Sequence, residues 1–188
     1  MRLIARLLIA SLIGIVVLIG SVGRTAANGT ILRARARVNG AAGSGISGEI
    51  LFFQVRQGVP AEVLILARVE GLTPNSVHGF HLHEIGACSP DFTAAGGHYD
   101  PGPEGNSNPD ANHPYHMGDM PNLRADAYGV AVFEHVTSRV TIALGPLSLF
   151  DQNGSSVIVH QNEDQGTTGV PGGSGGPRIA CGVIETVP

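Results

Sequence analysis

Alternating and apolar runs recur along the chain from residue 31 onward. The first, ILRARARV (31–38), places arginines on one face and Leu32, Ala34, Ala36 and Val38 on the other, as a half-buried strand does. Similar β-branched runs, bounded by Gly, Pro, Asn and Asp, lie at 49–55, 62–69, 129–136, 138–144, 155–160 and 179–187. No stretch shows a helical period of useful length. Seven or eight short strands in one core predict an all-β sandwich or flattened barrel.

The connections between these runs are of two kinds. An Asn-Gly pair, Asn153-Gly154, separates two apolar runs and predicts a hairpin turn. The connections 84–121 and 161–178 are much longer and rich in Gly, Pro, Asn and Asp. Connections of this length are usually either functional or disordered. The first contains histidines and aspartates, and the second directly follows a histidine, so we expect two long functional loops.

The N-terminal 27 residues have a different pattern. Arg2 and Arg6 precede an apolar stretch at 7–23, and the small residues TAA follow at 25–27. This order is typical of a secretory signal peptide. An uncleaved N-terminal membrane anchor is the alternative, because the stretch has the minimum length for spanning a bilayer. Either interpretation predicts that the domain at 28–188 is exported: periplasmic, extracellular or anchored to the outer face of the membrane.

The composition argues against nucleic-acid binding and includes two cysteines that can form a disulfide. The chain of 188 residues fits one domain, with a net charge of −4 and no lysine. No basic run is present, which argues against nucleic-acid binding. Cys88 and Cys181 are the two cysteines, and in an exported domain we expect one disulfide between them. Two buried free thiols are the alternative.

Clustered histidines indicate a metal site. In HGFHLHE (78–84), strand alternation puts His81 and His83 on one face and turns His78 to the other. SSVIVH ends in His160 on another predicted strand. Three imidazoles on neighbouring strands suit zinc, copper, nickel or iron, and the residue types do not choose among these metals.

A second set of possible ligands lies in the 84–121 loop. GGHYDP contributes His98, and HPYHMGD contributes His113, His116 and Asp119. The H-x-x-D spacing of His116 and Asp119 lets both side chains converge on one ion from a turn.

Over nearly all of residues 31–188 the chain resembles the copper/zinc superoxide dismutases. The resemblance rests on GFHLHEIGAC, AAGGHYDP, HMGDMPNL, VIVH followed by Asp164, and GGPRIACGVI, in the family's order and at close to its spacing. It implies an eight-stranded Greek-key β-barrel, a fold counted among the immunoglobulin-like sandwiches.

The same resemblance assigns a role to each matching residue. The implied copper ligands are His81, His83, His98 and His160, and the implied zinc ligands are His98, His116 and Asp119. His98 would be the imidazole that bridges the two metals. Asp164 matches a carboxylate that links histidines of the two sites. Arg178 matches the arginine that positions superoxide, Cys88 and Cys181 match the family's disulfide, and His78 matches a structural histidine.

The implied activity is that of an exported superoxide dismutase. Superoxide would be converted to dioxygen and hydrogen peroxide by copper cycling between copper(II) and copper(I), with His98 relaying a proton and Arg178 guiding the anion. Two alternatives keep the same fold: a copper-only dismutase without zinc, and a non-catalytic domain that binds or delivers copper. The expected partners are superoxide as a small-molecule substrate, the membrane where the N-terminal segment remains as a tether, and a second copy of the chain in a homodimer.

The chain departs from the family's pattern in two places. Where relatives carry a further zinc-binding histidine, this chain reads GNSN (105–108). His113 is the candidate replacement, and the alternative is that it is a surface residue preceding Pro114. The family's loop for steering superoxide usually carries lysines, whereas 161–177 has none and includes Glu163 and Asp164. We therefore expect weaker electrostatic acceleration of superoxide capture.

Overall fold

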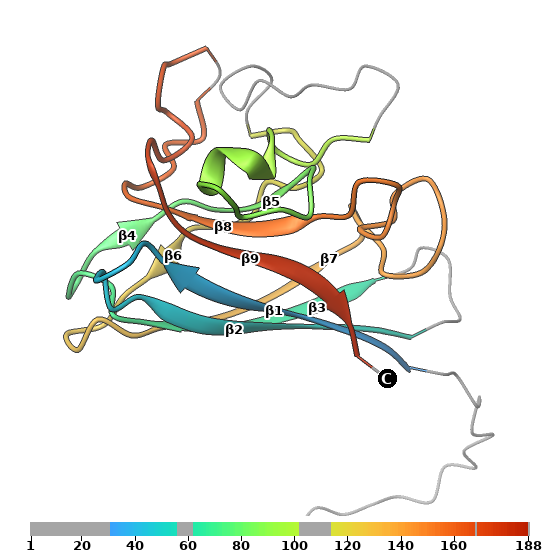
Figure 1. Cartoon of the computed structure of the whole chain (residues 1–188), viewed down its shortest axis with the longest axis horizontal. Helices are drawn as coiled ribbons and strands as arrows, with labels where there is room; N and C mark the ends of the chain where they lie inside the picture. The colour runs from blue at the N-terminus through green and yellow to red at the C-terminus, as the bar shows by residue number, and fades with distance from the viewer. Residues whose placement is uncertain (1–30, 56–61, 102–113, 168, 188) are drawn as a thin grey trace, which may run out of the picture.

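The computed structural model describes residues 31–55, 62–101, 114–167 and 169–187 (Figure 1). The predicted N-terminal segment 1–27 and the predicted ligand His113 lie outside the described residues. Among the described residues, no helix has the length and apolar character needed to cross a membrane.

The described chain forms an antiparallel β-structure (Figure 1). Its strands are β1 (Ile31–Gly40), β2 (Ser47–Val55), β3 (Val63–Glu70), β4 (Val77–His78), β5 (Phe80–His83), β6 (Leu123–Arg124), β7 (Ala131–Thr137), β8 (Ser156–His160) and β9 (Arg178–Thr186). A short 3-10 helix, η1 (Phe92–Ala95), lies in the connection after β5. The main sheet has the order β5-β8-β9-β1-β2-β3-β7, and β4 pairs with β6.

This arrangement confirms the predicted all-β fold. Only Gly79 separates β4 from β5, so the two pieces form one interrupted strand, and the strands then number eight within the described residues. The sheet curls, and β1 lies beside both β2 and β9 although β9 is last in the chain. Such non-consecutive neighbours are what a Greek-key barrel requires.

The alternating patterns determine which side chains face the interior of the barrel and which face solvent. Along β1, Ala34, Ala36 and Val38 are buried while Arg33 and Arg37 are exposed. The same alternation in β2, β3 and β7 fills the interior with apolar side chains, and Phe80 meets Phe133 there edge to face. In contrast, all residues of β5 and β8 are buried, because the long loops cover their outer side.

The predicted strand at 138–144 is wrong. Val140 and Ile142 do point into the core, but the backbone here forms an isolated bridge between Thr141 and Ser148 in place of a strand. The Gln54 Oε1 accepts hydrogen bonds from Ile142 N at 2.7 Å and from Thr141 Oγ1 at 2.8 Å. The Asn153-Gly154 turn precedes β8, with Gly154 at a positive φ of 65°, but no strand directly precedes it, so it does not close a hairpin.

The two long connections lie over one side of the barrel. Figure 1 shows η1 and the segment 161–178 on the same side as β5 and β8. The predicted disulfide is confirmed: Cys88, in the loop after β5, is bonded to Cys181 in β9. The bridge fastens this loop to the sheet next to the histidines.

Candidate metal centre

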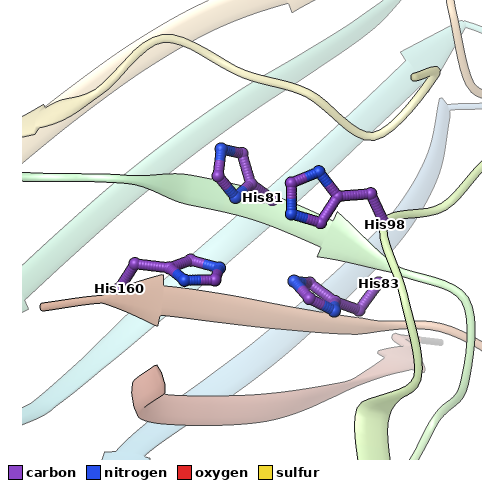
Figure 2. Close-up of side chains that lie close together, drawn as sticks. All are labelled: His81, His83, His98 and His160. Carbon is purple, nitrogen blue, oxygen red and sulfur yellow. The ribbon is translucent and has the colours of Figure 1, made fainter. Parts of the chain in front are cut away.

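Four buried histidines converge above β5 and β8 (Figure 2). His81 and His83 project from β5, His160 ends β8, and His98 follows η1. One ring nitrogen from each lies within 4.8 Å of those of the others. Because β5 and β8 are hydrogen-bonded neighbours, three of these ligands are fixed by the sheet itself. Strand alternation predicted the shared face of His81 and His83, and the structure confirms it.

Hydrogen bonds set which nitrogen each imidazole presents. His83 Nδ1 donates to the Gly96 carbonyl at 3.1 Å, and His160 Nδ1 donates to the Gly176 carbonyl at 2.9 Å. Carbonyl oxygens only accept, so each neutral ring keeps its lone pair on Nε2. In both residues Nε2 is buried and has no hydrogen-bond partner in the part of the chain that the structure describes. Buried, unsatisfied imidazole nitrogens facing one point fit a metal ion.

Burial also keeps these rings neutral. It is the main reason that the pKa of His98 falls to about 4 and the pKa of His160 falls to about 2. The pKa of His83 is also held well below its usual value by burial, and nearby His98 and Arg178 lower it further. A metal binds neutral imidazole, so His83, His98 and His160 can bind a cation without first losing protons at neutral pH.

A second group shares His98 with the first. It consists of His98, His116 and Asp119, all buried. Asp119 Oδ1 accepts from His98 Nδ1 at 2.6 Å, and Asp119 Oδ2 lies 3.0 Å from His116 Nδ1. With Nδ1 of His98 directed to this group, its Nε2 is left for the four-histidine group. Two imidazoles and one carboxylate are donors that suit zinc.

Short backbone contacts hold the second group against β5. Isolated bridges pair His83 with His98 and His81 with Asp119, so loop residues take the position of a neighbouring strand. Gly118 makes this approach possible, because a Cβ at that position would lie 2.4 Å from the Leu82 carbonyl oxygen. The glycine of HMGD is therefore a packing requirement next to the ligands.

Asp164 connects the 161–178 loop to His81. Its Oδ2 accepts from His81 Nε2 at 2.8 Å, which leaves Nδ1 as the lone-pair nitrogen of that ring. Asn122 holds Asp164 in place through two hydrogen bonds: its amide donates to Asp164 O and its Oδ1 accepts from Asp164 N, both at 2.9 Å. Sequence reasoning predicted Asp164 but missed Asn122, whose only signal was its place after HMGDMP.

Arg178 lies beside the four histidines at the start of β9. Its guanidinium donates to Phe92 O at 2.7 Å and to Gly96 O at 2.5 Å. The Gly96 carbonyl also accepts from His83 Nδ1, so one oxygen orients both the arginine and a candidate ligand. This shared carbonyl was not predictable from the sequence, because a glycine contributes no side chain to signal it.

The structure also places the remaining histidines. His78 turns away from both groups, as predicted, and its Nδ1 donates to the His160 carbonyl at 2.8 Å. It therefore supports the backbone of a candidate ligand. His135 lies on the edge strand β7, half-buried and outside both groups.

Comparisons with known proteins agree with this geometry. The family model described as copper/zinc superoxide dismutase matches residues 46–184. A "Superoxide dismutase [Cu-Zn]" of Caulobacter vibrioides is 42% identical over 132 residues, which cover 67% of this chain and 73% of that protein. A "Superoxide dismutase [Cu-Zn] 1" of Aquifex aeolicus is 38% identical over 127 residues, covering 65% and 73%.

A solved structure supports the fold. The crystal structure of the clock protein EA4 superposes with a TM-score of 0.64 at 29% sequence identity. The match covers 82% of this chain and 94% of that one, so the similarity extends over the barrel and its loops.

Proposed function

The chain belongs to the copper/zinc superoxide dismutase family, and from this membership we propose that it converts superoxide to dioxygen and hydrogen peroxide. The net reaction is 2 O₂⁻ + 2 H⁺ → O₂ + H₂O₂. The observation that carries the proposal is the convergence of four buried imidazoles, those of His81, His83, His98 and His160. These four residues would hold copper, which would supply the electron transfer, since zinc has no accessible second oxidation state.

The proposed ligands need little rearrangement to act. His83 and His160 are each fixed by a backbone carbonyl, and His81 by Asp164. Partners of this kind orient imidazole rings and raise their basicity as ligands. In this role the protein supplies a preorganised set of nitrogens, so the energetic cost of ordering them is met during folding.

His98 is the proposed proton carrier. Its Nδ1 is directed to Asp119, so Nε2 is the atom that takes up a proton and gives it to the developing peroxide. Its depressed pKa, about 4, arises mainly from burial. An imidazolium at this position is therefore a strong acid, which favours transfer of the proton to the product.

Arg178 is the proposed anion guide. Two carbonyl contacts hold its guanidinium next to the histidines, and no acidic side chain forms an ion pair with it among the described residues. A positive charge in a recessed site attracts a small anion and concentrates it there. Superoxide carries one negative charge and accepts hydrogen bonds, so it fits this donor.

Zinc is the second proposed metal. His98, His116 and Asp119 supply three ligands of the types that zinc prefers. His113 stays a prediction as the fourth ligand, because it lies outside the described residues. Zinc would act as a scaffold that fixes His98 from its Nδ1 side.

We further propose that the domain at 28–188 acts outside the cytoplasm, after cleavage of residues 1–27 or tethered to the membrane by them. The disulfide between Cys88 and Cys181 supports this, because disulfides persist in oxidising compartments. A homodimer is also proposed.

The test of the activity compares two histidine variants. The copper- and zinc-loaded protein is assayed for superoxide consumption beside His160→Ala and His135→Ala. We expect His160→Ala to lose copper and activity, while His135→Ala, on β7 and outside both groups, keeps both. Equal activity in the two variants would exclude the four-histidine group as the catalytic site.

A further inference from the structure

One peptide group, between Gly96 and Gly97, lies next to two residues of the proposed site. Its carbonyl oxygen, that of Gly96, accepts from His83 Nδ1 at 3.1 Å and from the Arg178 guanidinium at 2.5 Å. His98 follows this peptide directly in the chain, and Figure 2 shows its ring and that of His83 on adjacent segments. A change in the orientation of this peptide therefore affects a candidate ligand and the proposed anion guide together.

The other end of the same peptide contacts Glu84, the residue after β5. The N–H of Gly97 donates to Glu84 Oε1 at 2.8 Å, and Glu84 N donates to Gly97 O at 3.1 Å. Gly97 is buried and Glu84 is half-buried. A buried N–H without an acceptor is costly, so the carboxylate stabilises the peptide in this orientation. Glu84 forms no ion pair within the described residues, so its oxygens are not held by a basic side chain.

The backbone at Gly96 makes this contact possible. Gly96 has a positive φ of 73°, a conformation that favours glycine. A Cβ at position 96 would also lie 2.7 Å from Glu84 Cγ and Oε1, well below the usual van der Waals separation. The Glu84 side chain therefore packs directly against the peptide, in space that any other residue at 96 would fill.

We propose that Glu84 is a positioning residue: its carboxylate holds the Gly96–Gly97 peptide, and the peptide carbonyl orients both His83 and Arg178. Its effect on catalysis rests on the proposed function, in which His83 binds copper and Arg178 guides superoxide. Hydrogen bonds in series polarise one another, so a charged acceptor at the N–H strengthens the carbonyl as an acceptor. A stronger acceptor at Nδ1 makes Nε2 of His83 a more basic ligand.

A direct effect of the Glu84 charge on Arg178 is the alternative. Burial lowers the pKa of Arg178, and the nearby charges of Asp91 and Glu84 act in the opposite direction. Asp91 has the larger effect of the two, but its carboxylate accepts from Thr93 and forms no hydrogen bond to the Gly96–Gly97 peptide among the described residues. Asp91→Asn removes this charge and keeps a side chain that caps η1 well. It is therefore a matched control for charge.

Two conservative variants separate the position of the Glu84 carboxylate from its charge. Glu84→Asp keeps the charge but is one methylene shorter, so the acceptor is withdrawn or the peptide follows it. Glu84→Gln removes the charge but keeps a side-chain oxygen that can accept from Gly97 N. Positioning by Glu84 predicts a large effect of Glu84→Asp and a small effect of Glu84→Gln, whereas a direct charge effect on Arg178 predicts the reverse.

NMR of the side-chain N–H groups of His83 and Arg178 measures the positioning without reference to activity. The protein, purified after expression of the full chain, is measured with copper(I) and zinc, which are both diamagnetic, and again without metal. We expect Glu84→Asp to shift the signals of both groups and to speed their exchange with water about tenfold, as local opening does. Glu84→Gln and Asp91→Asn should leave the His83 signal close to its original position. The His160 Nδ1–H, which donates to a different carbonyl, is the internal control for folding.

Binding measurements on the copper-loaded protein give the consequence for the site. We expect Glu84→Asp to weaken copper binding about tenfold, within the range for residues that support a ligand. Binding of azide, a small monoanion, should weaken about threefold, because the Arg178 charge is less well placed. Glu84→Gln should change each affinity by about twofold at most, since only the charge of the acceptor is lost. Competition with a copper chelator and titration with azide measure the two affinities.

Several outcomes would contradict positioning by Glu84. The proposal is overturned if the His83 and Arg178 signals or the copper affinity are unchanged in Glu84→Asp, or if Glu84→Gln or Asp91→Asn has the larger effect. Loss of the His160 signal in Glu84→Asp would also overturn it, because Glu84 would then support the fold as a whole. If the signals respond as expected while the unmodified protein consumes no superoxide, the proposed function fails and the positioning by Glu84 stands.

Discussion

The two candidate metal groups differ in what holds their ligands. In the four-histidine group, His81, His83 and His160 project from paired strands. In the second group, His116 and Asp119 come from the loop before β6, and Asp119 contacts both imidazoles. The comparison indicates that strand residues preorganise most of one site, whereas loop residues, among them the Asp119 carboxylate, organise the other. Removing ligands should therefore affect the two groups unequally.

Loss of a ligand from each group should give the largest difference. We expect His83→Ala to reduce superoxide consumption by more than about 100-fold, beyond the 10–100-fold typical of residues that only support a ligand. His116→Ala should lose zinc but keep copper and a measurable part of the activity, because its ring belongs to the second group alone. Metal analysis and rate measurements on both variants check this. An equal loss of activity would show that the groups form one unit.

Weakening the support of His81 should have a smaller effect. We expect Asp164→Asn to reduce copper affinity by about tenfold, within the range for such partners, because the carboxylate that accepts from His81 Nε2 loses its charge. Asn122→Ala, which removes both hydrogen bonds to the Asp164 backbone, should act in the same direction but less. Competition with a copper chelator measures both.

A control within the same loop is Gln165→Ala. Gln165 is exposed, so its side chain should not affect copper affinity. If it weakens copper binding as much as Asp164→Asn does, the effect belongs to the loop as a whole and not to the contact with His81.

Loss of the Arg178 charge beside the four histidines should also have an effect of about tenfold, on the rate and not on the metal content. We expect Arg178→Ala to lower kcat/KM by about tenfold, because one half-buried positive charge and its donors are lost. Arg178→Lys should recover part of the rate, since it keeps the charge but not the planar pair of contacts to Phe92 O and Gly96 O.

Rates measured at constant ionic strength distinguish the effect of the Arg178 charge at its position from an effect of the protein's total charge. Arg124→Ala is the matched control, because that side chain is 72% exposed and lies near Glu163 in the loop. A similar loss in both variants would mean that total charge, and not the position of Arg178, sets the rate.

The smallest expected effect is that of salt. The segment 161–177 contains no lysine and includes Glu163 and Asp164, so few positive charges attract superoxide from a distance. We expect kcat/KM to fall only about twofold between low and physiological ionic strength, where charges more than about 8–10 Å apart become screened. A fall that is steeper than in relatives with lysines in this loop would contradict this account.

The sequence predicted the strand-borne site better than its surroundings. Alternation placed His81 and His83 on one face and turned His78 away, and both placements hold because a strand has a fixed period. The partners that fix the rings are backbone carbonyls, those of Gly96 and Gly176. A carbonyl is present at every residue, so its position is decided by the folded loops and leaves no mark in the sequence.

The error at 138–144 has a related cause. Its apolar pattern matches that of a strand, and Val140 and Ile142 are in fact buried. An alternating pattern predicts which side chains are buried, but it does not predict whether the backbone forms hydrogen bonds to a neighbouring strand. Here the Thr141 backbone bonds to Leu147 and Leu149 in the following loop, and Ile142 N donates to the Gln54 side chain. The second contact spans 88 residues, and no local pattern encodes it.

The most direct test of the central claim is the superoxide-consumption rate of one metal-free preparation reloaded with copper, with zinc, or with both. We expect no activity with zinc alone, and activity with copper alone because paired strands hold three of the four histidines. Full activity is expected with both metals. Full activity with copper alone would mean that the second group is dispensable. Activity with zinc alone, or none in any state, would contradict the claim that His81, His83, His98 and His160 hold a catalytic copper.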